Sequence, residues 1–187
     1  MDIVRSRRKT IAIQIREGKL IMKAPLRMAD RDIQAFIDRH EKWIRVHMEK
    51  AQTVQAAAAQ AGVLSEEQIR ELAKAAAEVI PERAAHFASL MGVSYGRITI
   101  RLQKTRWGSC SSRGNLNFNC LLMLCPPQVL DSVVVHELAH RKEMNHSDRF
   151  YAIVRRVYPE YDRWNRWLKE NGPVLQKRAA GDVRGDR

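Results

Sequence analysis

Within the first sixty residues, the spacing of apolar positions changes once, from that of a strand to that of a helix. Apolar and polar residues alternate over 10–16, which predicts a half-buried β-strand. Residues 20–24 predict its hairpin partner, which Pro25 ends. From Asp30 the apolar positions recur at helical spacing, and strong helix formers continue to Gly62. The pattern therefore predicts a β-hairpin followed by one long helix.

A capping signal predicts the next helix. Ser65 and Gln68 have the spacing of a capping box, so this helix should begin at Glu66. Pro81 should kink the helix or start a second one directly after it. Gly92 is typical of a helix end, because glycine adopts the left-handed conformation that ends helices.

Alternation returns in the middle of the chain and predicts a small sheet. Residues 98–102 form one expected strand and residues 115–120 another. Between them, the polar and glycine-containing segment 104–114 predicts a turn that carries one large aromatic residue, Trp107. The second strand has apolar residues on one face and three asparagines on the other, and we expect the asparagine face to lie beside a cleft.

The longest apolar run follows two prolines and predicts a buried helix. Proline suits the first turn of a helix, so the helix should begin at Pro126 or Pro127. Three consecutive valines, 133–135, favour a strand by propensity, and we expect burial to override that preference. The helix should continue about one turn past His140, until Asn145 reverses the chain.

The C-terminal part predicts two short helices. Ser147 should cap a helix over 148–158, and a second should cover 160–171. Gly172 and the proline after it should end that helix. Three regions follow from this pattern: a hairpin with a long helix over 1–62, a core over 63–172, and a disordered basic tail over 173–187.

One glutamate and three histidines supply candidate chemistry. On a helix, His136 and His140 lie one turn apart and can bind one ion, while Glu137 can reach a water on that ion as a general base. Catalytic zinc takes three protein ligands, and His146 is the candidate for the third. Its spacing matches the metzincin pattern, although Glu143 replaces the glycine of that pattern. The alternative is that the histidines are ordinary core residues.

Composition adds two constraints. The 187 residues suffice for one sizeable core, or for a core with a small appendage. Neither a secretory signal nor an apolar stretch long enough to cross a membrane is evident, and three cysteines without paired spacing indicate reduced thiols. We therefore expect a cytoplasmic protein. The net charge of +12 favours polyanions, either nucleic acid or phosphorylated substrates, although a solvated basic surface is the simpler interpretation.

Three segments together resemble the YgjP-like family of zinc metallopeptidases and, more distantly, the SprT-like and WLM proteases. They are Arg106–Ser111 (RWGSCS), Val133–His140 (VVVHELAH) and Met144–Ser147 (MNHS). The resemblance implies that His136, His140 and His146 bind Zn²⁺ and that Glu137 is the base. It also implies an α+β fold, in which a small, mainly antiparallel sheet packs on a zincin-type helix.

The residues around the motif suggest how a substrate binds. A peptide could add a strand beside 115–120, with Arg106 or Trp107 shaping the adjacent wall. Trp107 is equally suited to anchor the core. Tyr151, Arg106 and Asn117 are candidates for stabilising the oxyanion.

A metallopeptidase is the leading functional hypothesis, and two alternatives stay open. One is a metal-dependent phosphohydrolase acting on nucleotides, which the basic charge would attract. The other is a nucleic-acid-associated module in which zinc only stabilises the fold.

Overall fold

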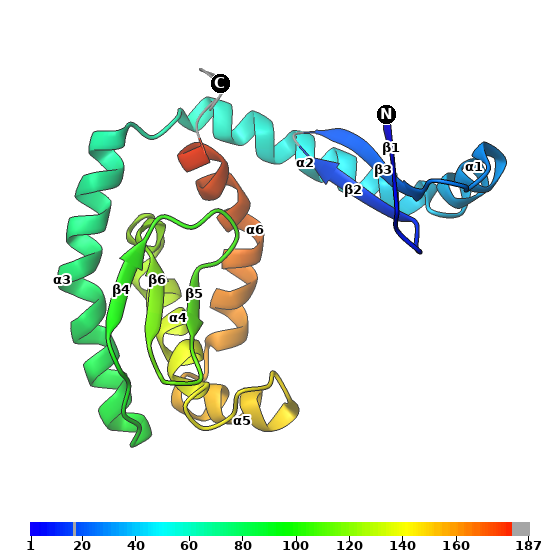
Figure 1. Ribbon diagram of the computed structural model, residues 1–187. Helices are drawn as coiled ribbons and strands as arrows, with labels where there is room; N and C mark the ends of the chain where they lie inside the picture. Colours follow the sequence, from blue (N-terminus) through cyan, green and yellow to red (C-terminus); the bar gives the residue numbers. More distant parts are fainter. Residues whose placement is uncertain (17, 181–187) are drawn as a thin grey trace. The chain divides into compact units, whose positions relative to one another are not determined.

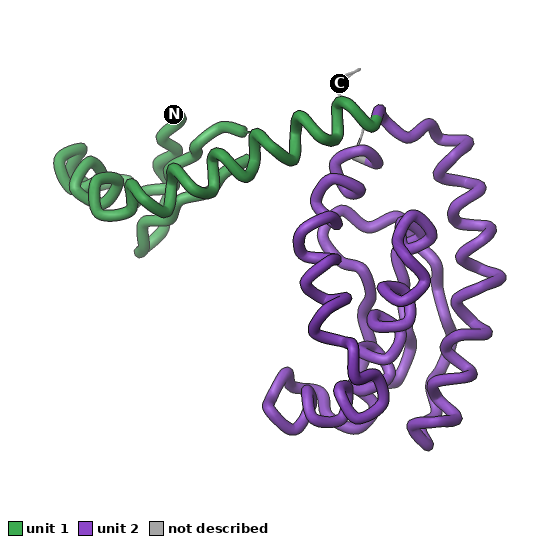
Figure 2. The backbone as a smooth tube through the Cα atoms, turned by 180° about the vertical axis from the view of Figure 1, so that it is seen from behind, with its two compact units in different colours: residues 1–61 green, residues 62–187 purple. Residues whose placement is uncertain are grey.

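The protein divides into two compact units, residues 1–61 and the residues from Gly62 onward (Figure 2). The computed structural model describes residues 1–16 and 18–180. Both units mix helices with a small three-stranded sheet, which confirms the predicted α+β class (Figure 1). No helix within the described ranges is long and apolar enough to cross a membrane.

The first unit contains the predicted hairpin and one strand that the pattern did not reveal. Its strands are β1 (Asp2–Ser6), β2 (Ala12–Arg16) and β3 (Lys19–Pro25). Strand β3 lies in the centre, antiparallel to β2 and parallel to β1. Strand β1 is exposed over most of its length, so it lacks the alternation that makes a half-buried strand recognisable.

The predicted long helix of this unit is two helices, α1 (Asp30–Arg39) and α2 (Glu41–Ala61). The break falls at His40, where the backbone leaves the helical region with φ −110° and ψ 12°. The His40 Nδ1 lies 2.7 Å from the Phe36 carbonyl oxygen, a contact that holds the last turn of α1. Ile33 of α1 packs with Met22 and Ala24 of β3 in a small apolar core.

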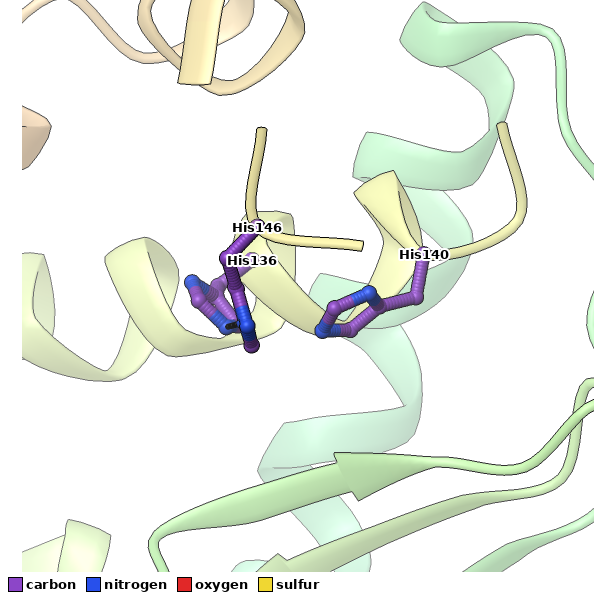
Figure 3. A group of neighbouring side chains, drawn as sticks. All are labelled: His136, His140 and His146. Carbon is purple, nitrogen blue, oxygen red and sulfur yellow. Dashed lines mark hydrogen bonds between the residues drawn. The ribbon is translucent and has the colours of Figure 1, made fainter. Parts of the chain in front are cut away.

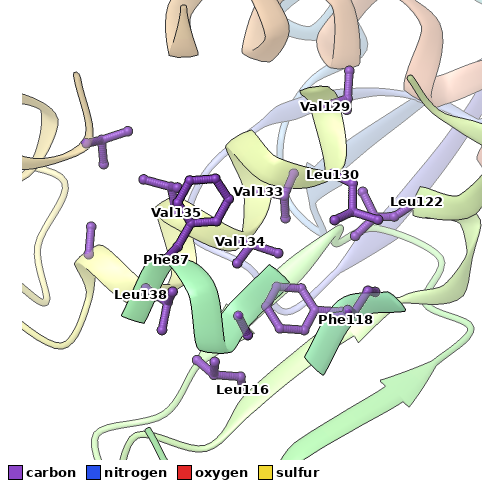
Figure 4. Packing of buried hydrophobic residues seen from close by; sticks show 14 of the residues in the cluster. Phe87, Leu116, Phe118, Leu122, Val129, Leu130, Val133, Val134, Val135 and Leu138 are labelled. Carbon is purple, nitrogen blue, oxygen red and sulfur yellow. The ribbon is translucent and has the colours of Figure 1, made fainter. Parts of the chain in front are cut away.

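The second unit surrounds one buried helix with the other elements. In chain order it comprises α3 (Glu66–Met91), β4 (Ile98–Arg101), β5 (Gly108–Cys110), β6 (Leu116–Asn119), the 3₁₀ helix η1 (Cys120–Leu124), α4 (Pro127–Ala139), α5 (Asp148–Val157) and α6 (Tyr161–Ala180). Helix α4 contacts α3, α5, α6, η1 and β5. Its valines and leucines lie in the centre of the apolar core, where burial overrides their strand propensity (Figure 4).

Helix α3 begins and ends as the sequence predicts. Ser65 and Gln68 form both hydrogen bonds of the capping box, and Gly92 adopts φ +60° at the C-terminus. Pro81 was predicted to kink the helix or to start a second one. It lies inside a single helix, so the second helix does not occur.

The second sheet has the order β4-β6-β5. Strand β6 pairs with β4 in parallel and with β5 in antiparallel fashion, so the sheet is mixed. The prediction of a simple turn over 104–114 was wrong, because β5 lies within it. Three residues are too few to show alternation, so the strand is visible only through its pairing with β6.

Helix α6 corrects the predicted tail. It runs through Gly172 and Pro173 to Ala180, so residues 173–180 are helical. A Cβ atom on Gly172 would lie 2.8 Å from Cζ2 of Trp107, so this glycine makes room for a packed indole and does not end the helix. The part of the predicted tail over 181–187 lies outside the described residues.

Candidate metal centre

The three predicted histidines converge at the C-terminal end of α4 (Figure 3). The Nε2 atoms of His136 and His146 are 3.0 Å apart, and one ligand atom from each of the three rings lies within 4.8 Å of the others. Tetrahedral Zn²⁺ with Zn–N distances of about 2.0–2.1 Å needs nitrogen atoms about 3.3 Å apart. The rings therefore fit one ion after small adjustments of their torsion angles.

The chain turns earlier than the sequence predicts. Helix α4 ends at Ala139, and His140 is its C-cap, so the expected additional turn is absent. The backbone tightens instead, because the amide of Arg141 donates to the Leu138 carbonyl at 3.0 Å. The Arg141 guanidinium donates to the Ser94 carbonyl at 2.9 Å and so ties the turn to the segment after α3. Ser147 caps α5 as predicted, and His146 directly precedes that cap.

Tyr161 is a site residue that the sequence reasoning missed. Its hydroxyl lies 2.8 Å from Nδ1 of His136, and its side chain is almost fully buried. When Nε2 of His136 binds a cation, Nδ1 carries the proton and donates it to this hydroxyl. Tyr161 thereby fixes the ring orientation. A tyrosine at the start of a predicted helix gives no sequence signal for such a role.

Glu137 packs against the edge strand β5. Its side chain is only 5% exposed. A Cβ atom on Gly108 would lie 2.6 Å from Oε1 of Glu137 and 2.9 Å from its Cδ. Any side chain at position 108 would therefore collide with the carboxylate. Gly108 is required for the space that it leaves.

Burial sets the charge states of these groups. It lowers the pKa of His136 to about 3, with His140 and His146 adding to the effect, so this imidazole is neutral at neutral pH. Neutral imidazole is the form that binds metals. Burial raises the pKa of Glu137 to about 8, partly offset by the positive charge of Arg106. A carboxyl group with a pKa near neutrality is suited to accept and return a proton.

Comparison with known proteins identifies the family of this chain. The family model described as YgjP-like, metallopeptidase domain, matches residues 9–71 and 64–171. The chain belongs to the YgjP-like family. No curated protein matches it significantly.

Two solved structures are similar to part of this YgjP-like protein. One is the metallopeptidase zymogen abylysin of Pyrococcus abyssi, with 21% identity and a TM-score of 0.45 over 49% of this chain and 94% of that one. The other is the metallopeptidase zymogen jannalysin of Methanocaldococcus jannaschii, with 20% identity and a TM-score of 0.45 over 50% of this chain and 97% of that one.

In this YgjP-like protein, a pocket of about 200 Å³ adjoins Glu137 and His136. Arg106 and Trp107, the two alternatives predicted to shape a wall, line it together with Gly108. The remaining lining residues come from α4 and α6: Ser132, Val133, His136, Glu137, Tyr161, Asn165 and Leu168.

The other two predicted substrate residues lie away from this pocket. The Asn117 amide donates to Ser109 Oγ at 3.2 Å, across the pair β6–β5. Tyr151 lies beside the three histidines. The centroid of its ring is 6.2 Å from that of His146 and 6.3 Å from that of Tyr161. The structure thus brings Arg106 and Trp107 together at the pocket, and it places Tyr151 at the histidines.

One asparagine of β6, Asn119, holds the loop before β5. Asn119 is fully buried, and its amide donates to the carbonyls of Gln103 at 2.8 Å and Arg106 at 2.9 Å. Its Oδ1 accepts from the Leu121 amide at 3.1 Å. Asn119 therefore fixes the backbone of the segment that carries Arg106.

Proposed function

We propose that this protein is a zinc-dependent peptidase in which Glu137 is the general base. The observation that supports this most strongly is the convergence of His136, His140 and His146 beside a buried carboxylate. Three nitrogen ligands on one face, with the fourth position open, are typical of catalytic zinc sites. Membership of a metallopeptidase-domain family supports the same reaction class.

The three imidazoles would hold the zinc. When bound in such a site, zinc acts as a Lewis acid and lowers the pKa of a coordinated water to about 7. Tyr161 keeps Nε2 of His136 directed at the ion by pairing with Nδ1. The hydrogen bond from Nδ1 of His140 to the Glu143 carbonyl, at 3.2 Å, does the same for the second ligand.

Glu137 would move the proton. Its carboxylate accepts a proton from the attacking water and returns it to the leaving amine. Burial favours the protonated form of Glu137, which the second step requires. Strand β5 restricts the carboxylate on one side, because Gly108 leaves room for it and for nothing larger.

The peptide would bind along β5, not beside β6. Strand β6 is the central strand, with β4 and β5 on its two sides, so the predicted strand addition beside 115–120 is impossible. The Asn119 amide donates to the Trp107 carbonyl and the Ser111 amide to the Asn115 carbonyl. Because hydrogen-bonding groups alternate along a strand, the groups of Gly108 and Cys110 face the other edge. Among the described residues, no strand pairs with that edge, so it offers main-chain bonds to an extended peptide.

The test is hydrolysis by zinc-loaded protein of two substrate sets, a peptide library and a panel of nucleotides. Peptide cleavage that requires zinc and is lost in Glu137→Gln supports the proposal. Hydrolysis of nucleotides alone would establish a phosphohydrolase instead. Zinc binding without any turnover, together with salt-dependent DNA binding, would favour a nucleic-acid module. The three free cysteines fit a reducing compartment, and we propose the cytoplasm as the site of action.

A further inference from the structure

The pocket beside Glu137 has apolar walls and one exposed cationic side chain, Arg106. Trp107, Val133 and Leu168 contribute apolar surface. Arg106 is exposed and lies at the pocket with its guanidinium available. Among residues 1–16 and 18–180, it forms no ion pair and no side-chain hydrogen bond. Arg83, by contrast, is paired with Asp131 at 2.7 Å.

The backbone that carries Arg106 is held firmly. The fully buried Asn119 binds the carbonyls of Gln103 and Arg106, and Trp107 packs against Gly172 of α6. An arginine with a fixed backbone and an unpaired guanidinium presents five donors in a fork, and that fork fits a carboxylate. The pocket lining has one carboxyl group, that of Glu137, and it is buried.

The position of the pocket identifies what part of a substrate enters it. His136, one of the three converging histidines, lines the pocket together with Glu137, the proposed base. A peptide bond under attack therefore places the side chain or the terminal group of an adjacent residue in the pocket. The apolar walls suit a short aliphatic stem, and Arg106 suits an acidic group at its end. Asn165 on α6 adds an amide that can also donate.

We propose that this pocket selects substrates with a carboxylate on a residue next to the scissile bond, and that Arg106 is the specificity-determining residue. This inference rests on the proposed peptidase function. The carboxylate has two possible sources, the side chain of Glu or Asp and the C-terminus of the substrate.

The experiment measures cleavage of matched peptides by zinc-loaded full-length protein. Peptides blocked at both ends carry Glu, Gln or Lys at each scanned position, and a second set has a free C-terminus. Mass spectrometry locates the cleaved bond. We expect kcat/KM to be about tenfold higher for Glu than for Gln next to that bond, the size of one charge-assisted contact. Selectivity confined to the second set would identify the terminal carboxylate as the group bound.

Three variants assign the preference to Arg106. Arg106→Gln should bring the Glu and Gln peptides within about twofold of each other, and Arg106→Glu should favour Lys. Lys104→Gln removes the same charge from the same segment but is not a lining residue, so it should keep the wild-type preference. A preference that survives in Arg106→Gln, or one that Lys104→Gln removes equally, would overturn the proposal.

A measurement of peptide binding tests the pocket independently of the peptidase reaction. Calorimetric titration of zinc-loaded Glu137→Gln with the same peptides measures the pocket without turnover. Tighter binding of the carboxylate peptides that depends on Arg106, with no cleavage by the wild type, would retain the pocket and reject the peptidase. Cleavage by the wild type, with equal affinity for the Glu and Gln peptides, would retain the peptidase and reject the proposed role of the pocket.

Discussion

The two small sheets of this protein have the same topology and carry different chemistry. In each, the last strand in sequence lies in the centre, parallel to the first strand and antiparallel to the second. In the first unit the central strand β3 is buried on one face, where Met22 and Ala24 lie, and exposes Lys19 and Lys23 on the other. One face of that sheet covers the small apolar core of the first unit.

The second sheet differs because a helix end meets its edge. Three of the four residues of β6 are buried, and its antiparallel neighbour β5 contacts α4. This contact brings Gly108 against Glu137, one residue from His136. The comparison teaches that topology alone does not create the site. The site also requires a glycine on an edge strand and a buried carboxylate on the adjacent helix.

The largest expected effect tests the base itself. Glu137→Gln should lower kcat for peptide hydrolysis by about 10³-fold and leave zinc affinity nearly unchanged, because the carboxylate moves protons and is not a ligand. Activity assays and zinc titration measure the two quantities. The matched control is Glu78→Gln on the exposed face of α3, which should retain full activity. Equal activity of the two variants would remove Glu137 from the mechanism.

The next effect tests the edge strand. Gly108→Ala introduces a Cβ atom 2.6 Å from Oε1 of Glu137, so the carboxylate must move. A displacement of about 1 Å in a catalytic group lowers activity by about 10²-fold. Gln14→Ala on β2, the corresponding antiparallel edge strand of the first sheet, should change neither activity nor zinc binding. If Gly108→Ala keeps its activity, the packing of β5 on Glu137 is not needed for catalysis.

A smaller effect tests the partner of the first ligand. Tyr161→Phe removes the hydroxyl 2.8 Å from Nδ1 of His136 and should weaken zinc binding by about 10- to 100-fold. Equilibrium titration against a competing chelator measures this affinity. Tyr151→Phe is the control, because that ring packs near His146 without a hydrogen bond to any of the three histidines in the described structure. Unchanged affinity in Tyr161→Phe would show that the hydroxyl does not orient the ligand.

The last effect is on stability and depends on pH. In zinc-free protein the pKa of Glu137 is raised from 4.5 to about 8, so between these values the folded state holds a proton that the unfolded state has lost. Stability from this group therefore falls as pH rises through the window, by at most about 1.4 kcal/mol per pH unit. The Glu137→Gln variant should not lose stability in this way, because glutamine does not titrate.

Denaturant unfolding at several pH values checks that difference. The free energy of unfolding of Glu137→Gln, relative to wild type, should rise from pH 5 to pH 8. His136, whose pKa is lowered to about 3, makes both proteins less stable as pH falls from its ordinary value of 6.5, and this contribution cancels in the comparison. A constant difference across the range would show that Glu137 titrates normally.

The sequence predicted the parts of the molecule that local patterns determine. The capping box at Ser65, the hairpin of β2 and β3, the start of α4 and the clustering of the three histidines all follow from spacing and composition. Each of these needs only residues close together in sequence or a motif whose geometry is fixed by one helix.

The remaining features depend on contacts between distant segments. Gly172 was predicted to end a helix. It lies inside α6, where the absence of a side chain leaves room for Trp107. Tyr161 reaches His136 across 25 positions, and Asn119 holds a loop 13 to 16 residues before it. Residue type alone does not distinguish these roles from ordinary turn or core positions, because the partner is absent from the local pattern.

The most direct test of the central claim is equilibrium zinc titration of the wild type and of three single histidine variants. We expect one zinc ion per chain in the wild type, and affinities lower by about a hundredfold or more in each of His136→Ala, His140→Ala and His146→Ala. The exposed His86 of α3 provides the control, and His86→Ala should bind zinc like the wild type. If any one of the three variants also binds zinc with wild-type affinity, the three imidazoles do not share one ion and the proposed centre is wrong.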